Sequence, residues 1–191
     1  MKTTKLKLAL GITLGLLTIT GGINAQDFGA GDKDLSIGLG FGGYLYYPGD
    51  YSLLPEISAS FDYGLRDDWG PGVFGVGAFM GISRTGTDDL IVVSGEFGVR
   101  YTNVTIAPRA TYHYQFVDKL DTYAGALLGL GIQSQKPYGT WPTAEPDTKV
   151  NLVLVEAVFV GARYYFTRNF AGFAEVGVGV SYLTLGMTFK M

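Results

Sequence analysis

The last eleven residues of the chain, 181–191, alternate strictly between two faces of an extended strand, in which successive side chains point to opposite sides. One face holds Ser181, Leu183, Leu185, Met187, Phe189 and Met191, and the other holds Tyr182, Thr184, Gly186, Thr188 and Lys190. A membrane-spanning strand of a closed β-barrel needs about 9–11 residues of this kind. The pattern therefore predicts such a strand at this end of the sequence.

Seven earlier segments alternate in the same way. They cover residues 34–47, 55–66, 72–83, 101–116, 121–135, 150–166 and 170–180. The links after the second, fourth and sixth segments are short, whereas 84–100 and 136–148 are long, as expected for short periplasmic turns and longer outer loops. The sequence thus predicts an all-β fold, an eight-stranded antiparallel up-and-down transmembrane β-barrel with both termini on the periplasmic side.

Two irregular features qualify this pattern. Residues 84–100 are interpreted as an outer loop whose Leu90–Val93 run extends the flanking strands above the membrane. Pro108 lies within the fourth segment, where it removes one hydrogen bond from the ladder because proline has no N–H.

Charged residues set the register of the predicted barrel. A Lys or Arg that faced lipid at mid-depth would cost about 2–4 kcal/mol, so the charged faces are assigned to the interior. The predicted lumen charge network contains Asp62, Arg66, Arg109, His113, Arg163, Glu175 and Lys190. Glu156 has the opposite parity to Arg163 and is expected to point outward near the outer headgroups. A three-residue turn at 168–170 predicts that Arg163 lies directly across from Glu175.

The N-terminal stretch predicts export. Lys2, Lys5 and Lys7 precede the apolar run 8–20, and small residues precede a predicted cleavage after Ala25. We therefore expect a signal peptide at 1–25 and an outer-membrane β-barrel domain at 26–191. The apolar run is too short for a transmembrane helix, which needs about 20 residues.

Composition and charge agree with this location. The chain is 47% hydrophobic with 29 Gly, 13 Tyr and 12 Phe, which is typical of a barrel whose exterior contacts lipid. Aromatic residues gather at segment ends, as interfacial girdles do. Removal of the signal lysines lowers the net charge from −3 to about −6, which argues against nucleic acid as a partner. The chain has no Cys, which excludes disulfides and thiolate metal sites.

Several motifs resemble those of the OmpA-like, opacity-type family of small outer-membrane β-barrel proteins. They are RYYFT at 163–167, FAE at 173–175, SYLTLGMTFK at 181–190, RATYH at 109–113 and KLDTYAG at 119–125. The family's usual terminal aromatic is replaced by Met191, with Phe189 two residues earlier. The resemblance implies an eight-stranded barrel in the outer membrane, inserted by the barrel assembly machinery with the help of periplasmic chaperones.

Three features of the sequence resemble binding or catalytic motifs. The glycines of 38–43 have a spacing like a dinucleotide fingerprint, but they fall at period two within a strand, which favours a role in shaping a narrow lumen. His113 is the sole histidine and is expected to point inward, whereas a lipid-cutting enzyme needs a base and nucleophile at the lipid-facing rim. Asp88–Asp89, Glu145 and Asp147 are interpreted as solvated loop acids rather than as a cation site.

Three functional classes follow in order of preference. The preferred class is not an enzyme, and no cofactor or metal is predicted. The first is a structural or surface-interaction barrel with a side-chain-filled lumen, which binds outer-membrane lipid around it and presents loops 84–100 and 134–149 to an extracellular ligand. The second is a narrow, porin-like channel for small solutes or ions. The third is a lipid-modifying barrel enzyme. A lumen of eight strands is just wide enough for side chains to fill, which favours the first class.

Overall fold

A computed structural model of the 191-residue chain describes residues 28–43, 51–66, 70–88, 97–139 and 146–191. The predicted signal peptide at 1–25 and the predicted strand extension at 90–93 lie outside the described residues. No helix within the described ranges is long and apolar enough to cross a membrane.

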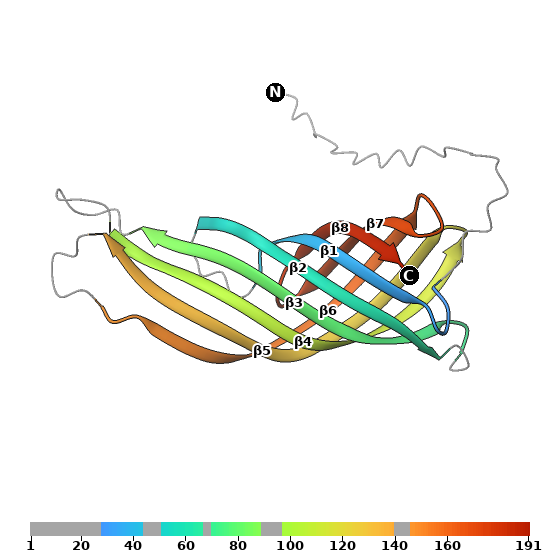
Figure 1. Cartoon of the computed structure of the whole chain (residues 1–191), viewed down its shortest axis with the longest axis horizontal. Coiled ribbons are helices and arrows are strands. Elements are labelled where there is room, and N and C mark those ends of the chain that lie inside the picture. The colour runs from blue at the N-terminus through green and yellow to red at the C-terminus, as the bar shows by residue number, and fades with distance from the viewer. Residues whose placement is uncertain (1–27, 44–50, 67–69, 89–96, 140–145) are drawn as a thin grey trace, which may run out of the picture.

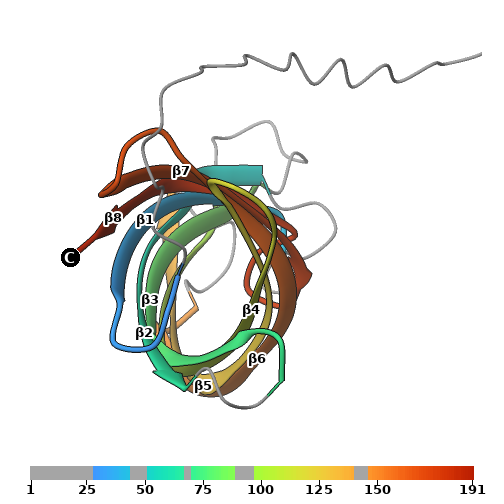
Figure 2. The same ribbon diagram turned by 90° about the vertical axis from the view of Figure 1, so that its right-hand side faces the viewer.

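Eight antiparallel strands form one closed barrel in which each strand pairs with its neighbours in sequence, and β1 pairs with β8 (Figures 1 and 2). The strands are β1 Lys33–Phe41, β2 Tyr51–Arg66, β3 Val73–Asp88, β4 Phe97–Val117, β5 Leu120–Gly139, β6 Lys149–Tyr165, β7 Phe170–Val178 and β8 Leu183–Lys190. The predicted fold class is confirmed.

The barrel has a shear of ten residues. Starting from Leu39, the cross-strand pairs that run through β2, β3, β4 and β5 reach β6 at Leu152. The pairs that run the other way through β8 and β7 reach β6 at Ala162, ten residues further along the strand. Eight strands with this stagger tilt by about 40° and enclose a space that side chains fill.

The two faces of each strand follow the predicted parity. Large apolar side chains point outward and are exposed, among them Ile37, Met80, Ile106, Leu128, Val160 and Met187. The inward face carries glycine, hydroxyl and charged residues, and most of the charged ones are buried. Because the apolar side is the exposed side, the register predicted from the cost of lipid-facing charges is confirmed.

The strand ends differ from the predicted segments. The first strand ends at Phe41 rather than at residue 47, because Gly42 and Gly43 adopt positive φ angles of 70° and 138°. The seventh ends at Val178, where Gly179 has a φ of 128°, and Val180 then turns into the lumen and is buried. The predicted loops are shorter than expected, since β3, β4 and β5 extend through 84–88, 97–100 and 136–139.

Pro108 has the predicted local effect. The ladder between β4 and β5 runs from Ile106, opposite Leu130, to Arg109, opposite Leu127, and residues 107 and 108 have no partner on β5. On the other side, Pro108 still lies opposite Ala78 of β3.

The two ends of the barrel are unequal. Strands β3, β4, β5 and β6 extend well beyond the ends of β1, β7 and β8 at the end with the long connections (Figure 1). The other end holds the start of β1, the end of β8 and the short turns after β2, β4 and β6. Short turns mark the periplasmic side of an outer-membrane barrel, so we expect the tall strands to rise on the outer side and name the two ends accordingly.

Candidate functional site

Arg163 is the centre of the ion-pair network in the lumen. Its side chain comes from β6, is fully buried, and donates to Asp34 of β1 at 3.0 Å and to Asp62 of β2. Its Nη1 also lies 3.6 Å from the carboxylate of Asp121 on β5. One guanidinium thus connects four strands, because its planar fork of donors serves several acceptors at once. Tyr165 donates its hydroxyl proton to the same Asp34 carboxylate at 2.7 Å.

A second buried guanidinium lies farther from the end of the barrel that carries the short turns. Arg109 of β4 places Nε 3.0 Å from Asp62 and donates through Nη2 to Glu175 of β7 at 3.0 Å. Tyr123 donates its hydroxyl proton to the same Glu175 oxygen at 2.8 Å, and the guanidinium of Arg163 lies 4.5 Å from the centre of the Tyr123 ring. The two arginines therefore share Asp62 and form one continuous network.

Glycine makes room for this network at Gly161 on β6. A Cβ there would lie 2.6–2.7 Å from three atoms of the Tyr123 side chain, which is closer than real contacts allow. The glycine lets the ring lie close to the β6 backbone and beside the guanidinium of Arg163.

The predicted pairing of Arg163 with Glu175 is wrong. Arg163 lies opposite Phe173, and Glu175 lies opposite Gly161. The reason is the hairpin between β6 and β7, which is centred on residue 168 rather than on 169 as the three-residue turn required. Shifting the centre by one residue moves every partner by two positions along β7 and keeps the face unchanged.

The periplasmic mouth is closed by residues that precede β1. Phe28 is buried and stacks on the imidazole of His113, with ring centres 4.0 Å apart and an angle of 27° between the planes. The turn 29–32 holds this aromatic in place: Gly31 donates to the carbonyl of Gly64 at 2.7 Å, and the Asp32 carboxylate accepts from Gly29 at 2.7 Å.

Two further contacts attach this turn to the wall. Asp32 forms an ion pair with Lys190 of β8 at 2.7 Å. A Cβ at Gly64 would overlap the carbonyl oxygen of Gly29, so the close approach of the turn to β2 requires glycine at that position. We call residues 28–32 the stopper.

His113 sits directly behind the stopper. Its Nδ1 is 2.9 Å from Asp121 and its Nε2 is 2.9 Å from the hydroxyl of Thr111. A hydroxyl, an imidazole and a carboxylate in this order resemble the arrangement that activates a nucleophile. All three side chains are buried, however, and Phe28 covers the imidazole face. The hydroxyl is thus enclosed by its neighbours, and the contacts serve as hydrogen bonds between buried polar groups.

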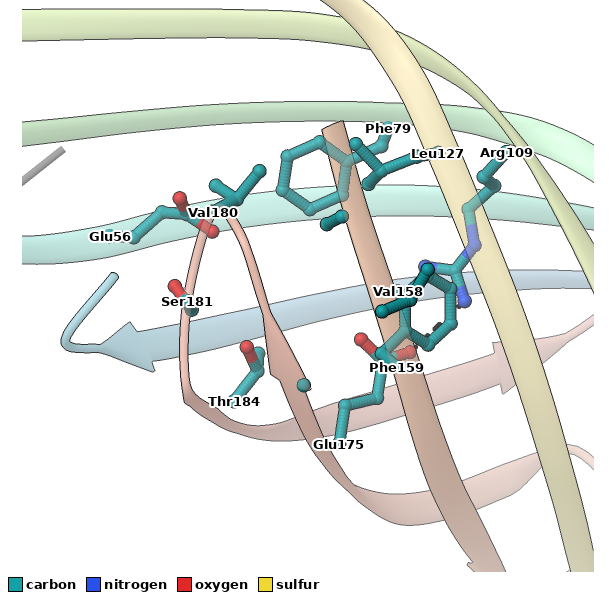
Figure 3. A pocket seen from close by; sticks show the side chains of 12 residues that line it. Glu56, Phe79, Arg109, Leu127, Val158, Phe159, Glu175, Val180, Ser181 and Thr184 are labelled. Atoms are coloured by element: carbon teal, nitrogen blue, oxygen red, sulfur yellow. Dashed lines mark hydrogen bonds and ion pairs between the residues drawn. The ribbon is translucent and has the colours of Figure 1, made fainter. Parts of the chain in front are cut away.

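An apolar layer crosses the lumen beyond the ionic network, and buried polar side chains such as Asn103 and Gln133 lie farther out. Phe79, Ala107, Leu127, Val155 and Val180 form a buried cluster on which Val153, Ala157 and Phe159 also pack. Beside it lies a cavity of about 30 Å³, bordered by Glu56, Arg109, Glu175, Ser181 and Thr184 as well as by the aromatic rings (Figure 3). A space of this size holds only one or two water molecules. Side chains therefore fill this layer of the barrel as well as the ionic network next to it.

The structure brings together most of the predicted network. Asp62, Arg109, His113, Arg163 and Lys190 are buried in the lumen, and Glu175 is largely buried there. Arg66 is the exception, because a bulge between Gly64 and Arg66 puts it opposite the outward residue Phe74 and leaves it exposed.

The residue pattern did not single out several residues that line or close the lumen: Phe28, Asp32, Asp34, Glu56, Asp121, Tyr123 and Tyr165. Strand parity identifies most of these, since Asp34 and Glu56 share a face with their strands' inward serines and Asp121 and Tyr123 with Gly125. Phe28 and Asp32 precede the first strand, where no alternation exists to signal their role.

The outer surface carries exposed aromatic side chains near the strand ends. Aromatic side chains of Tyr114, Phe116, Tyr164, Phe166 and Phe170 surround the periplasmic end, and Tyr114 and Phe116 make an edge-to-face contact at 4.6 Å. Glu156 points outward, as predicted, two residues beyond the point where β7 ends. Aromatic residues near the strand ends, an apolar exterior and a charged interior are the features of a membrane-spanning β-barrel, the class of protein that the sequence predicts.

Comparison with known proteins gives matches among solved structures. The N-terminal β-barrel domain of Pseudomonas aeruginosa OprF is 17% identical, with a TM-score of 0.45, and the alignment covers 85% of this chain and 99% of that one. Yersinia pestis Ail in a phospholipid bilayer nanodisc is 20% identical, with a TM-score of 0.45 and coverage of 84% and 99%. Ail in complex with the heparin analogue sucrose octasulfate is 15% identical, with a TM-score of 0.47 and coverage of 85% and 99%.

These matches concern the fold alone. No protein-family model matches the chain, and no curated protein matches it.

Proposed function

We propose that the chain is a non-enzymatic outer-membrane barrel that acts through the outer ends of its tall strands, with a lumen that conducts no solute. The observation that carries this proposal is the combination of a filled interior with an uneven rim. Ion pairs occupy the periplasmic part of the lumen, an apolar layer crosses it next to them, and β3 to β6 extend beyond β1, β7 and β8 at the other end. The part of the molecule that remains free to meet partners is the outer rim.

The candidate channel has less support. A continuous water path would have to cross the buried cluster around Phe79 and Leu127 and then pass the stopper, and the cavity between them holds one or two waters. The candidate lipid-modifying enzyme is also disfavoured, because His113 faces the lumen and both of its nitrogens are engaged by buried partners.

The absence of cysteine allows a direct test of topology and role. Asp147→Cys, in the connection between β5 and β6, should react with a membrane-impermeant maleimide on intact cells. Arg168→Cys, in the turn between β6 and β7, should react only after the cells are lysed. The opposite labelling pattern would place the tall strands in the periplasm and end the proposal.

The role itself is tested by adhesion. Cells that carry the barrel should adhere to host-cell monolayers and surface glycans more strongly than cells that lack it. Shortening the β3–β4 and β5–β6 hairpins by cross-strand pairs should remove the difference, whereas a change in the turn at 166–169 should not. In planar bilayers the same protein should give no stable single-channel openings. Large, stable openings in every preparation would favour the channel instead.

A further inference from the structure

The outward wall formed by β3, β4 and β5 changes abruptly from apolar to basic toward its outer end. Ile82, Val104 and Ile132 lie opposite one another on adjacent strands and belong to the apolar wall. Two residues further out, about 7 Å along the strand, Arg84 follows Ile82 on the same face. A further two residues out, Arg100 of β4 and Lys136 of β5 lie directly opposite each other, both exposed.

These three cations are close neighbours. Directly opposed side chains have Cβ atoms about 5 Å apart, and diagonal neighbours such as Arg84 and Arg100 about 7–8 Å apart. Arg84 donates to the hydroxyl of Thr102 at 3.3 Å, and the guanidinium of Arg100 lies 5.2 Å from the centre of the Tyr138 ring. Both contacts orient the side chains and leave their charge in place.

Like charges placed directly opposite on two strands are unfavourable unless something neutralises them. Within the described residues, no carboxylate forms an ion pair with any of the three cations. An anion that bound between them would relieve the repulsion, and guanidinium groups suit phosphate oxygens because two N–H donors match two oxygens.

We infer that Arg84, Arg100 and Lys136 form a binding site for the phosphate of an outer-leaflet lipid headgroup. The position favours a lipid over a soluble anion, because Arg84 lies only two residues along β3 from Ile82 of the apolar wall that contacts the acyl chains. A lipid held there would place its chains against Ile82, Val104 and Ile132 and its phosphate among the three side chains. This site goes beyond the proposed role of the outer rim and does not depend on it.

The test compares two double variants that remove equal charge. Arg100→Gln with Lys136→Gln removes the opposed pair, and Lys33→Gln with Arg168→Gln removes two exposed cations at the periplasmic end. Each full-length mature protein is placed in nanodiscs of phosphatidylcholine that contain a minor fraction of phosphatidic acid, and the lipids that remain bound are identified by native mass spectrometry. Migration on unheated gels confirms that each variant is folded.

Wild type and the periplasmic variant should retain phosphatidic acid in preference to phosphatidylcholine. The R100Q/K136Q variant should lose about fivefold in retention for each charge removed, or about 25-fold in total. Equal retention by all three proteins, or an equal loss in both variants, would overturn the site.

A second arm separates the lipid from a soluble anion. In maltoside micelles without lipid, inorganic phosphate should bind wild type far more weakly than phosphatidic acid does in the nanodisc. In the same micelles, K136Q alone should unfold at the same or a higher denaturant concentration than wild type, because the opposed charge is gone. Inorganic phosphate that bound as tightly as phosphatidic acid would overturn the assignment to a lipid headgroup. A lower midpoint for K136Q in the lipid-free micelles would show that no repulsion exists to be relieved.

Discussion

Phe28 stacks on His113 at a ring-centre distance of 4.0 Å and covers the face of the imidazole that points toward the periplasm. The contact joins a residue outside the barrel strands to a buried strand residue, so the stopper covers the periplasmic end of the ionic network. Because His113 is the only histidine in the chain, its reactivity reports directly on whether this lid is closed.

Phe28→Ala should therefore open the periplasmic mouth. We expect a loss of about 3 kcal/mol in the free energy of unfolding, as for other buried phenylalanines. We also expect His113 to react with diethyl pyrocarbonate about tenfold faster or more, since local opening governs the access of reagents to buried groups. Mass spectrometry of the modified peptide measures the rate.

Phe79→Ala is the matched control for this prediction. Phe79 is also buried, but it lies six residues beyond Val73, the residue of β3 that pairs with His113. This variant should lose similar stability without exposing the histidine. Equal reactivity of His113 in wild type and F28A would mean that the stopper does not protect the lumen.

Arg163→Met should destabilise the barrel by about 3–5 kcal/mol, because it leaves the carboxylates of Asp34, Asp62 and Asp121 without their shared cation. Arg163→Lys should lose less, since it keeps the charge but not the fork of donors that reaches two strands. Urea unfolding in detergent micelles measures both. Arg168→Met, in the exposed turn, should change the free energy by less than about 0.5 kcal/mol. A loss below about 1 kcal/mol for R163M would show that the network contributes little.

The register between β6 and β7 is tested by cross-linking in the cysteine-free chain. Ala162→Cys combined with Ala174→Cys should oxidise readily to a disulfide, because these residues lie directly opposite each other on the outward face. Ala162→Cys combined with Val176→Cys, the pair required by a turn centred on residue 169, should not, since diagonal residues lie beyond the usual reach of a disulfide. Faster cross-linking of the second pair would restore the pairing of Arg163 with Glu175.

Gly161→Ala tests the packing around Tyr123. A methyl group at this position meets the phenol ring at 2.6–2.7 Å, so the ring must move away from Arg163 and Glu175. We expect a loss of about 1–3 kcal/mol, typical of overpacking. Gly172→Ala, in the same sheet, places its Cβ 3.3 Å from the flexible Phe166 ring and should cost less. Equal losses for the two variants would argue against a constrained Tyr123.

The alternation of residue types is sufficient to predict the strands, their inward and outward faces and the burial of most of the charged residues. It is insufficient to predict which charges meet. Partners across a hairpin depend on the centre of the turn, and a shift of a single residue at 168 exchanges Glu175 for Phe173 opposite Arg163. Contacts through the lumen, such as Arg163 with Asp34, depend on the shear of the closed barrel and are 129 residues apart in sequence.

Local backbone irregularities account for the remaining differences. The bulge after Gly64 reverses the direction of Arg66, and Gly179 turns Val180 from the outer face into the lumen. Neither feature interrupts the alternating pattern of residue types. The stopper is different again, because its aromatic and acidic residues lie outside any strand and their role depends on the barrel mouth that they fill.

Along the membrane-spanning part of each strand, the outward side chains are apolar and face hydrocarbon, while the inward side chains, which include the charged ones, are enclosed in the lumen. The most direct test places single spin-labelled cysteines at consecutive positions 126–132 of β5 in liposomes and measures collisions with oxygen and with a water-soluble nickel chelate. We predict that the collision rate with oxygen alternates from one residue to the next: positions 126, 128, 130 and 132 should be open to oxygen, and positions 127, 129 and 131 should be shielded from both reagents. Free access of the nickel chelate to the even positions would contradict it.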